Sequence, residues 1–389
     1  MEQKQKLIFA ADFGNEKISF AAAKKDEKGT MEIVDFQEFN NSGYINNGIA
    51  SNGFYKKFDE KIENFAQKNK MEIGGFCFSA AHALRSEILV FPISETNVEE
   101  LEKCRKQALA IELSNKNRAV FDAHSSGFEG GNELNAKFMI LTVKNTVKTD
   151  YSREIRKINN VEYRTKYFPA PMVEAEILLS PEQKKEGCLL IDFGAGSTSI
   201  ALYRGNTPKF CAVAPLGGKH ITNDIAKRFG ISFDSAENLK KNYGSALKNE
   251  NLIIPNFENK EIDAEILAET ITERLSETLN FLMQEIENQG IIVPSEVVIA
   301  GGGSQMKSLP QFLKTYCEAN VKFAKIPEPK LTNALLYSLL QKFDKDCAKT
   351  ETVPVVTTKT GKGKKDEKKG GGFFQRLIPG FKDETEFEQ

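Results

Sequence analysis

The chain lacks a dominant charge, a long hydrophobic run and a secretory leader. Its 389 residues carry a formal net charge of −1, so its overall charge does not favour nucleic acid or anionic lipid as a partner. Because no run of 18 apolar residues occurs, we expect no helix that spans a membrane. The opening MEQKQK is too short for a signal peptide.

Cysteine and histidine are also sparse. Six cysteines are scattered without a C-x-x-C pair, which is typical of reduced thiols in a cytosolic protein and argues against a disulfide framework or a zinc site. Three histidines, His82, His124 and His220, form no recognisable site and are interpreted as structural or surface residues. The remaining composition, 40% hydrophobic and 28% charged, suits a globular protein of two or more domains.

One sequence pattern occurs twice in the chain. An apolar run ends in Asp-Phe-Gly at Asp12, in IFAADFGNEKISF, and again at Asp192, in LLIDFGAGSTSIALY. A third apolar run, in VVIAGGGSQMKSL, ends in Gly301, Gly302 and Gly303. Two hairpins with glycine turns and a strand ending in three glycines predict a two-lobed nucleotide clamp. The alternative is three ordinary strand ends with glycine turns.

The residue types explain this prediction. Glycine in a turn lets backbone N–H groups approach a phosphate, because no Cβ stands in the way. The predicted phosphate loops comprise Gly14, Asn15 and Lys17 in one lobe, and Gly194, Ala195, Gly196, Ser197 and Thr198 in the other. Asp12 and Asp192 would hold Mg²⁺ through water, since Mg²⁺ usually keeps several waters. The three glycines would let the backbone approach the adenosine, with the dipole of a helix beginning at Ser304 adding to the site.

Hydrophobic periodicity organises the rest of the chain. Strands are expected at 7–23, 31–39 and 73–79, and amphipathic helices at 54–68, 98–113 and 264–288. Residues 125–135, rich in Gly, Ser and Asn, are expected to form a loop, and Asp234 with Glu237 resembles a capping box. The predicted divisions are a first-lobe core at 1–80, an inserted βα subdomain at 81–163, a connecting segment at 164–187, a second lobe at 188–325 with a smaller part at about 232–290, and a return helix at 326–345.

The C-terminal part changes character. Residues 346–372 read as a disordered basic linker, 373–382 as an amphipathic segment and 383–389 as an acidic tail. The apolar residues of the segment fall within an arc of about 140° on a helix, which favours an interfacial membrane anchor. Its members are Phe373, Phe374, Leu377, Ile378 and Phe381, with Arg376 beside them. The alternatives are a peptide that docks on its own domain or a partner, and a disordered tail.

The order of these parts resembles the bacterial actin-like cell-division protein FtsA. The resemblance runs through most of the chain and is most specific in PLGGKHITNDIAKRFG, AENLKKNYG, GGGSQMKSL and the tail. It implies a two-lobed α/β fold of the actin/Hsp70 ATPase type, with the inserted subdomain in the first lobe. It further implies binding of ATP and Mg²⁺, polymerisation, and tethering of FtsZ to the cytoplasmic face of the inner membrane at the division site, together with other division proteins.

The resemblance also assigns residues. Gly217 and Gly218 would belong to the nucleotide site, and Glu237 and Lys240 would contact the ribose and base. Arg274 and Glu277, in ERLSETLNFL, would receive the C-terminal tail of FtsZ.

Two features depart from the family pattern. Asn15 stands where actin-like ATPases more often carry Ser or Thr, although its amide can still donate to a phosphate. No hydrolytic residue is evident in PAPMVEAEILL, where Glu174 and Glu176 are candidates that we interpret as solvated helix charges. Nucleotide binding is therefore expected, and the catalytic residue is not identified.

Other functions on this fold remain open. One alternative is a pilus-assembly scaffold of the same actin-like branch, and another is a small-molecule kinase or a chaperone-type ATPase. A kinase needs a catalytic base beside a substrate pocket, and a chaperone needs a peptide-binding domain after the second lobe, where about 45 residues remain.

Overall fold

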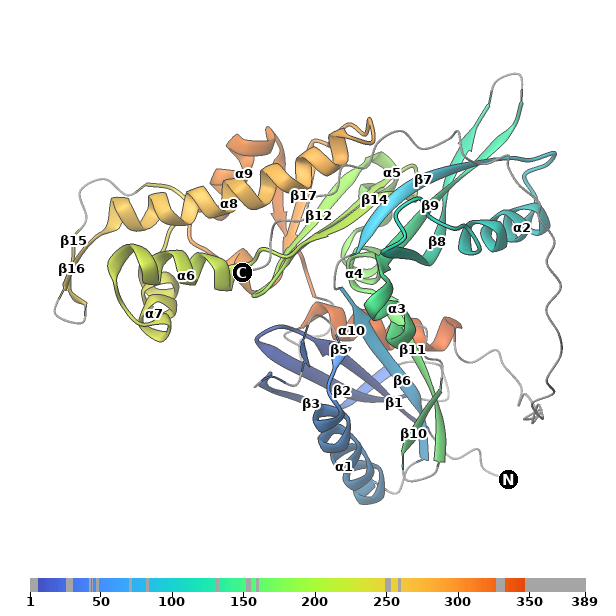
Figure 1. Ribbon diagram of the computed structural model, residues 1–389, viewed down its shortest axis with the longest axis horizontal. Helices are drawn as coiled ribbons and strands as arrows, with labels where there is room; N and C mark the ends of the chain where they lie inside the picture. The colour runs from blue at the N-terminus through green and yellow to red at the C-terminus, as the bar shows by residue number, and fades with distance from the viewer. Residues whose placement is uncertain are drawn as a thin grey trace.

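The computed structural model describes residues 6–346 apart from short gaps. These gaps are 26–30, 42, 44, 47–48, 70–71, 82–83, 131–132, 152–154, 159–160, 249–252, 258–259 and 327–332. The linker beyond residue 346, the amphipathic segment 373–382, the tail 383–389 and His82 lie outside the described residues. Figure 1 shows two lobes, the lower built on the N-terminal strands and the upper on the second half of the chain together with the inserted residues 85–144.

The first lobe is a six-stranded sheet with helices on both faces. Its strand order is β10 (Ile155–Ile158), β11 (Val161–Pro169), β6 (Glu72–Ala80), β1 (Lys6–Phe13), β2 (Lys17–Lys25) and β3 (Met31–Asn40). Alternate residues of β1 point to opposite faces, as strand geometry requires. Leu7 and Phe9 pack towards α1 (Asn52–Asn69), and Ile8 and Ala10 pack towards α10 (Ala334–Asp346).

The second lobe repeats this design on a larger sheet. The order is β18 (Asn320–Phe323), β17 (Glu296–Ala300), β12 (Cys188–Phe193), β13 (Thr198–Arg204), β14 (Thr207–Ala214), β7 (Arg85–Pro92), β9 (Asn135–Lys144) and β8 (Arg118–Glu129). One face is covered by α6 (Gly218–Phe229), α7 (Phe233–Tyr243), α8 (Ala264–Glu287) and α9 (Leu309–Cys317). Among the described residues, no helix is both long and apolar enough to cross a membrane.

The sequence repeat is a structural repeat. β1–β2–β3 and β12–β13–β14 are antiparallel meanders, and β6 and β17 lie parallel to β1 and β12. Asp12 pairs with Ser19 across its hairpin, and Asp192 pairs with Ser199 across the other. The two aspartates therefore occupy equivalent positions in the two lobes.

The inserted segment joins the second sheet. It leaves the first lobe after β6 and includes α2 (Val98–Leu109), and its strand β7 pairs with β14 through Arg85 and Ala212. Backbone N–H groups of β14 extend this contact, since Val213 donates to the carbonyl of Leu84 at 3.1 Å. The chain returns through α3 (Asn145–Tyr151) to β10 and β11, so the boundary expected at 163 falls inside β11 of the first sheet.

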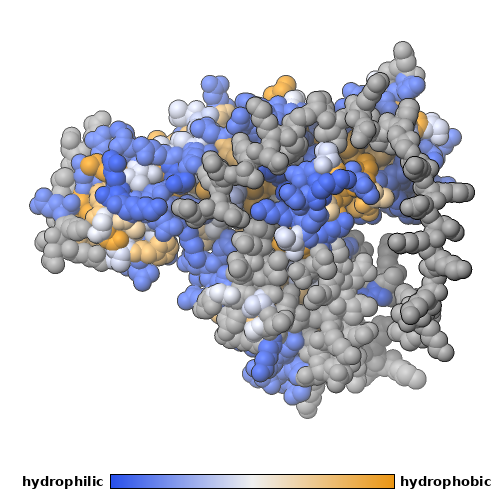
Figure 2. Space-filling view, in the orientation of Figure 1, coloured by the Kyte–Doolittle hydropathy of each residue, from blue (hydrophilic) through white to orange (hydrophobic). Residues whose placement is uncertain are grey.

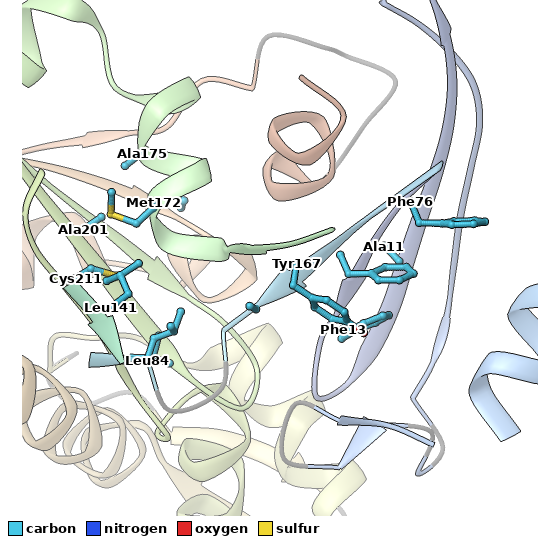
Figure 3. Close-up of a cluster of buried hydrophobic side chains, with 14 of the residues drawn as sticks. Ala11, Phe13, Phe76, Leu84, Leu141, Tyr167, Met172, Ala175, Ala201 and Cys211 are labelled. Atoms are coloured by element: carbon cyan, nitrogen blue, oxygen red, sulfur yellow. The ribbon is translucent and has the colours of Figure 1, made fainter. Parts of the chain in front are cut away.

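Smaller elements complete the molecule. They are the ribbons β4 (Ile45–Asn46) with β5 (Ile49–Ala50) and β15 (Ile253–Phe257) with β16 (Lys260–Asp263), the helices α4 (Ala170–Leu178) and α5 (Pro181–Glu186), and the 3₁₀ turn η1 (Gly302–Gln305). Helix α4 lies between the lobes, and one hydrophobic cluster runs past it from sheet to sheet. In Figure 3 the cluster extends from Phe13 and Tyr167 in the first lobe to Met172 and Cys211. This shared core fixes the base of the interlobe cleft.

Three local expectations were wrong. Residues 125–129 are strand, because β8 continues to Glu129 by pairing with β9 around a bulge, with Gly127 at φ +104°. The N-cap of α7 is Ser232, which accepts from the N–H of Ser235, and not Asp234. No helix begins at Ser304, because the three glycines lead into η1 and the next helix starts at Leu309.

Candidate functional site

The two hairpin turns face each other across a deep cleft. Its volume is about 2720 Å³. Both predicted phosphate loops, Gly301 to Gly303 and the connecting helix α4 contribute to its lining. Its lining residues come from both lobes, which Figure 1 shows as the lower and upper parts of the molecule, and from α4 and α10. The sequence repeat thus brings residues 180 positions apart into one site.

Glycines keep the loops close together. A Cβ on Gly217 would lie 2.6 Å from the N–H nitrogen of Ser197 and 2.7 Å from the carbonyl oxygen of Gly194. In turn, the N–H of Gly218 donates to that carbonyl at 3.0 Å. Thr198 fastens the same turn, because its hydroxyl donates to the carbonyl of Leu216 at 2.8 Å. The 216–218 turn therefore supports the second phosphate loop.

Three carboxylates line the cleft. Asp12 accepts from the Ser79 hydroxyl at 3.0 Å and from the Asn333 amide at 3.0 Å. Burial raises its pKa despite these bonds. Burial, followed by the charge of Asp12, raises the pKa of Asp192 to about 7. Glu174 on α4 is the third, and its pKa is raised well above its ordinary value by burial and then by the charges of the two aspartates.

Glu174 corrects the interpretation as a solvated helix charge. Its side chain is 4% exposed, and its Oε2 has no hydrogen-bond partner among the described residues. Glu176 does pair at the surface of α4, with Lys342 of α10. The sequence signal was the apolar flanks of Glu174 in PAPMVEAEILL, which bury the whole inner face of this short helix.

The glycine triplet forms the other wall. Gly301 has φ +79°, and a Cβ there would overlap the Asp192 carboxylate, so only glycine fits. A Cβ on Gly303 would lie 2.8 Å from the Cβ of Phe193. At Gly302 an added Cβ would meet nothing within 4 Å, because this position faces the open cleft. Gly302 is thus available to a ligand, and Gly301 and Gly303 allow this segment to pack closely on the end of β12.

Glu237 and Lys240 form a buried pair at the cleft edge. The Lys240 ammonium donates to Glu237 at 2.7 Å, to Thr222 at 2.8 Å and to the carbonyl of Gly218 at 2.9 Å. Burial opposes the charged form of Glu237, but hydrogen bonds from Lys240, Thr222 and Lys241 outweigh it and lower the pKa of Glu237. Both side chains line the cleft on the side of the second phosphate loop.

The remaining predicted residues lie in two places. Lys17 begins β2 and pairs with Glu38 at 3.6 Å at the cleft mouth. Arg274 lies on α8, where it binds Asp224 of α6 with two hydrogen bonds of 2.6 and 3.1 Å, and Glu277 with one of 2.5 Å. Arg274 and Glu277 are therefore neighbours on the outer surface, away from the carboxylates. Ser79, Lys219 and Asn333 contribute to the site without a local sequence signal, because only the fold brings them there.

The raised pKa of Asp192 makes a prediction about stability. The folded protein holds a proton that the unfolded chain releases above its ordinary pKa of 3.8, so this contribution to stability is lost as the pH rises through about 7. We therefore expect the melting temperature of the ligand-free protein to fall between about pH 4 and 7 and to level off above that, and Asp192→Asn to reduce the fall. Scanning calorimetry at several pH values measures it, and equal pH slopes for both proteins would contradict the assignment.

Comparison with solved structures identifies the fold. A chain of the PilM–PilN type IV pilus biogenesis complex superposes with a TM-score of 0.61 and 16% identity, over 86% of this chain and 98% of that one. MreB5 of Spiroplasma citri bound to ADP superposes with a TM-score of 0.50 and 13% identity, over 87% and 96%. The chain therefore has the actin-like ATPase fold, as the repeated hairpins predicted.

Sequence comparison places it more narrowly. The family model "Cell division protein FtsA" matches residues 189–338. The chain is 24% identical over 341 residues to FtsA of Buchnera aphidicola and 22% identical over 340 residues to FtsA of Escherichia coli K12; each match covers 78% of this chain and 80% of the relative. The predicted resemblance to the cell-division protein FtsA is confirmed.

Proposed function

We propose that this chain is an ATP-binding scaffold that polymerises and tethers FtsZ filaments to the cytoplasmic face of the inner membrane at the division site. The observation that carries the proposal is the cleft between the two Asp-Phe-Gly hairpins, which places two glycine loops opposite three carboxylates. MreB5 of Spiroplasma citri, which shares this fold, was solved bound to ADP, and this supports a nucleotide as the ligand of the cleft.

The site fits a magnesium nucleotide. Asp12, Asp192 and Glu174 repel one another, and burial raises the pKa of each; a divalent cation offsets both effects by favouring their charged forms. Among the described residues no three ligating side chains are placed to hold a metal directly, and Mg²⁺ held by its own waters needs no such group. When bound, the ion supplies charge neutralisation for the phosphates.

The protein's own residues then have distinct roles. Backbone N–H groups of the two loops bind phosphate, and Gly302 leaves space for the adenosine. Glu237 and Lys240 are placed to bind the ribose and base from the side of α7. Glu174, with its unpartnered Oε2 in the cleft, orients the attacking water and accepts its proton.

The arm formed by α6, α7 and α8 is the proposed docking site for the FtsZ tail. Arg274 and Glu277 supply both charge signs on α8. Phe233 and Tyr243, at the two ends of α7, are exposed large apolar residues of the same arm. Figure 2 shows hydrophobic side chains among hydrophilic ones there. Such a mixed surface suits a peptide with both apolar and charged residues.

Membrane attachment is assigned to the segment 373–382. One short apolar stripe binds a bilayer only weakly, but many copies on one filament bind together through avidity. ATP favours assembly if the assembled state binds it better. Membrane residence therefore depends on polymerisation, and polymerisation on nucleotide.

Liposome co-sedimentation tests the proposal. The full chain should pellet with vesicles of phosphatidylethanolamine and phosphatidylglycerol, and ATP with Mg²⁺ should change the amount. A chain ending at Lys369, and Phe374→Glu, should lose binding at least about tenfold, since burying one Phe side chain contributes ~1.5–3 kcal/mol. Thr358→Glu adds the same charge to the linker and should still pellet. If the full and shortened chains behave alike, the tail is a docking peptide and a pilus-type scaffold becomes the better account.

A further inference from the structure

The Asp12 carboxylate is fixed through both of its oxygens. The Ser79 hydroxyl donates to Oδ1 at 3.0 Å, and the Asn333 side-chain amide donates to Oδ2 at 3.0 Å. Ser79 is itself fixed, because its hydroxyl oxygen accepts from the backbone N–H of Phe13 at 3.0 Å. One hydrogen bond on each oxygen gives the carboxylate a defined orientation in the cleft, which Asp12, Ser79 and Asn333 all line.

Asn333 uses both ends of its amide. Its Oδ1 accepts from the backbone N–H of Leu336 at 3.2 Å. Because α10 begins at Ala334, this is the hydrogen bond of a helix N-cap. An N–H group can only donate, so the amide oxygen must face Leu336 and the amino group must face Asp12. Asn333 therefore joins the Asp12 carboxylate to the first turn of α10.

Helix α10 gives this amide a firm support. Its buried leucines pack on the face of the first sheet that carries Ile8 and Ala10; they are Leu335, Leu336, Leu339 and Leu340. Side chains packed in this way leave the helix little freedom to shift. The amino end of a helix also favours a nearby negative charge, so the first turn of α10 favours the ionised form of Asp12. The support for Asp12 comes from a residue 321 positions away in the chain.

A carboxylate that binds magnesium through water depends on such support. Mg²⁺ demands near-octahedral geometry and keeps several of its waters, so the carboxylate must accept hydrogen bonds from those waters in set directions. Side chains that orient such a group typically contribute about 10- to 100-fold to metal affinity. The hydrogen bond from Asn333 is of this kind, because it reaches the carboxylate and leaves the cleft side open.

We propose that Asn333 is a positioning residue that orients Asp12 towards the hydrated magnesium and joins magnesium binding to the start of α10. The inference rests on the proposed function, in which Asp12 holds the ion through water. With the ion bound, Asp12 holds the Asn333 amide more firmly, and Asn333 in turn holds the N–H of Leu336. Occupancy of the cleft thereby stabilises the first turn of α10.

Substitutions at Asn333 separate its two hydrogen bonds. Asn333→Ser keeps an acceptor for the N-cap, because serine caps helices about as well as asparagine, but it has no amide to reach Asp12. We expect this variant to melt close to the unmodified protein and to reduce the ratio of ATP affinity in Mg²⁺ to that in EDTA about tenfold. Asn333→Ala removes both bonds, so it should reduce the ratio equally and also lower the melting temperature. Titration calorimetry measures the affinities.

Ser338→Ala is the matched control within α10. The buried Ser338 hydroxyl donates to the carbonyl of Ala334 at 2.9 Å and lies outside the cleft lining, so its loss alters the helix and leaves Asp12 in place. Its affinity ratio should match that of the unmodified protein. A ratio for Asn333→Ser within about twofold of the unmodified value would overturn the proposal, because Asn333 would then act only as a cap.

Hydrogen exchange tests the link to α10. In the unmodified protein, ATP with Mg²⁺ should slow exchange in the first turn of α10 more than ATP with EDTA does, and Asn333→Ser should lose this difference. The same slowing in both proteins would overturn the link. Failure of the unmodified protein to bind ATP more tightly in Mg²⁺ than in EDTA would instead overturn the magnesium site of the proposed function.

Discussion

Replacing Gly302 with leucine should abolish ATP binding and leave the fold intact. An added Cβ at this position meets nothing within 4 Å, because the space belongs to the open cleft. A leucine side chain would fill the volume assigned to the adenosine. We expect affinity to fall at least about a hundredfold, or ~2.7 kcal/mol, in titration calorimetry, with unchanged far-UV circular dichroism and melting temperature.

Gly301→Leu is the matched control, in which the same substitution is expected to destabilise the fold. Gly301 has φ +79°, and its Cβ would overlap the Asp192 carboxylate and lie 2.6 Å from the carbonyl oxygen of Phe193. The same side chain one residue earlier should therefore lower the melting temperature, because it strains the backbone and displaces β12. Wild-type ATP affinity in Gly302→Leu would refute the placement of the adenosine.

Glu174→Gln should stop ATP turnover while ATP still binds. The amide preserves the size of the side chain and removes its capacity to accept a proton. Loss of a positioned general base lowers turnover by about 10²-fold or more. Phosphate release under single-turnover conditions measures the rate, and calorimetry measures binding in the same preparation.

Glu176→Gln is the corresponding control. Glu176 lies half a turn further along α4, outside the cleft lining, and its carboxylate pairs with Lys342. Turnover should stay near the unmodified rate, because that pair acts at the surface of the helix. Equal turnover in Glu174→Gln and Glu176→Gln would show that the buried glutamate has no catalytic role.

The repeated motif carried most of what the sequence could predict. An apolar run that ends in Asp-Phe-Gly and is followed by a second apolar run predicts a hairpin from neighbouring residues. The hairpins β1–β2 and β12–β13, and the equivalence of Asp12 and Asp192, could therefore be predicted from the sequence. The long helix expected at 264–288 is α8, because its apolar residues recur at helical spacing. These features depend on residues that are close in the sequence, and sequence analysis could therefore predict them.

The errors share a different cause. Glu174 was interpreted as a solvated charge because glutamate is usually exposed, and its burial results from the packing of α4 against α10, β13 and β14. The polar residues 125–129 read as a loop, and pairing with β9 makes them a strand. The docking of β7 on β14 rests on contacts between residues more than 120 positions apart. Local periodicity contains no information on such pairings.

The central claim is that the two lobes clamp one magnesium nucleotide between their Asp-Phe-Gly hairpins. Titration of the unmodified protein with ATP, in Mg²⁺ and again in EDTA, tests it most directly. The account predicts one saturable site, tighter binding with Mg²⁺, and proton release near neutral pH as Asp192 gives up its proton. Absence of saturable binding would contradict the claim. So would an ATP affinity that is unchanged both when EDTA replaces Mg²⁺ and when Gly302 is replaced by leucine.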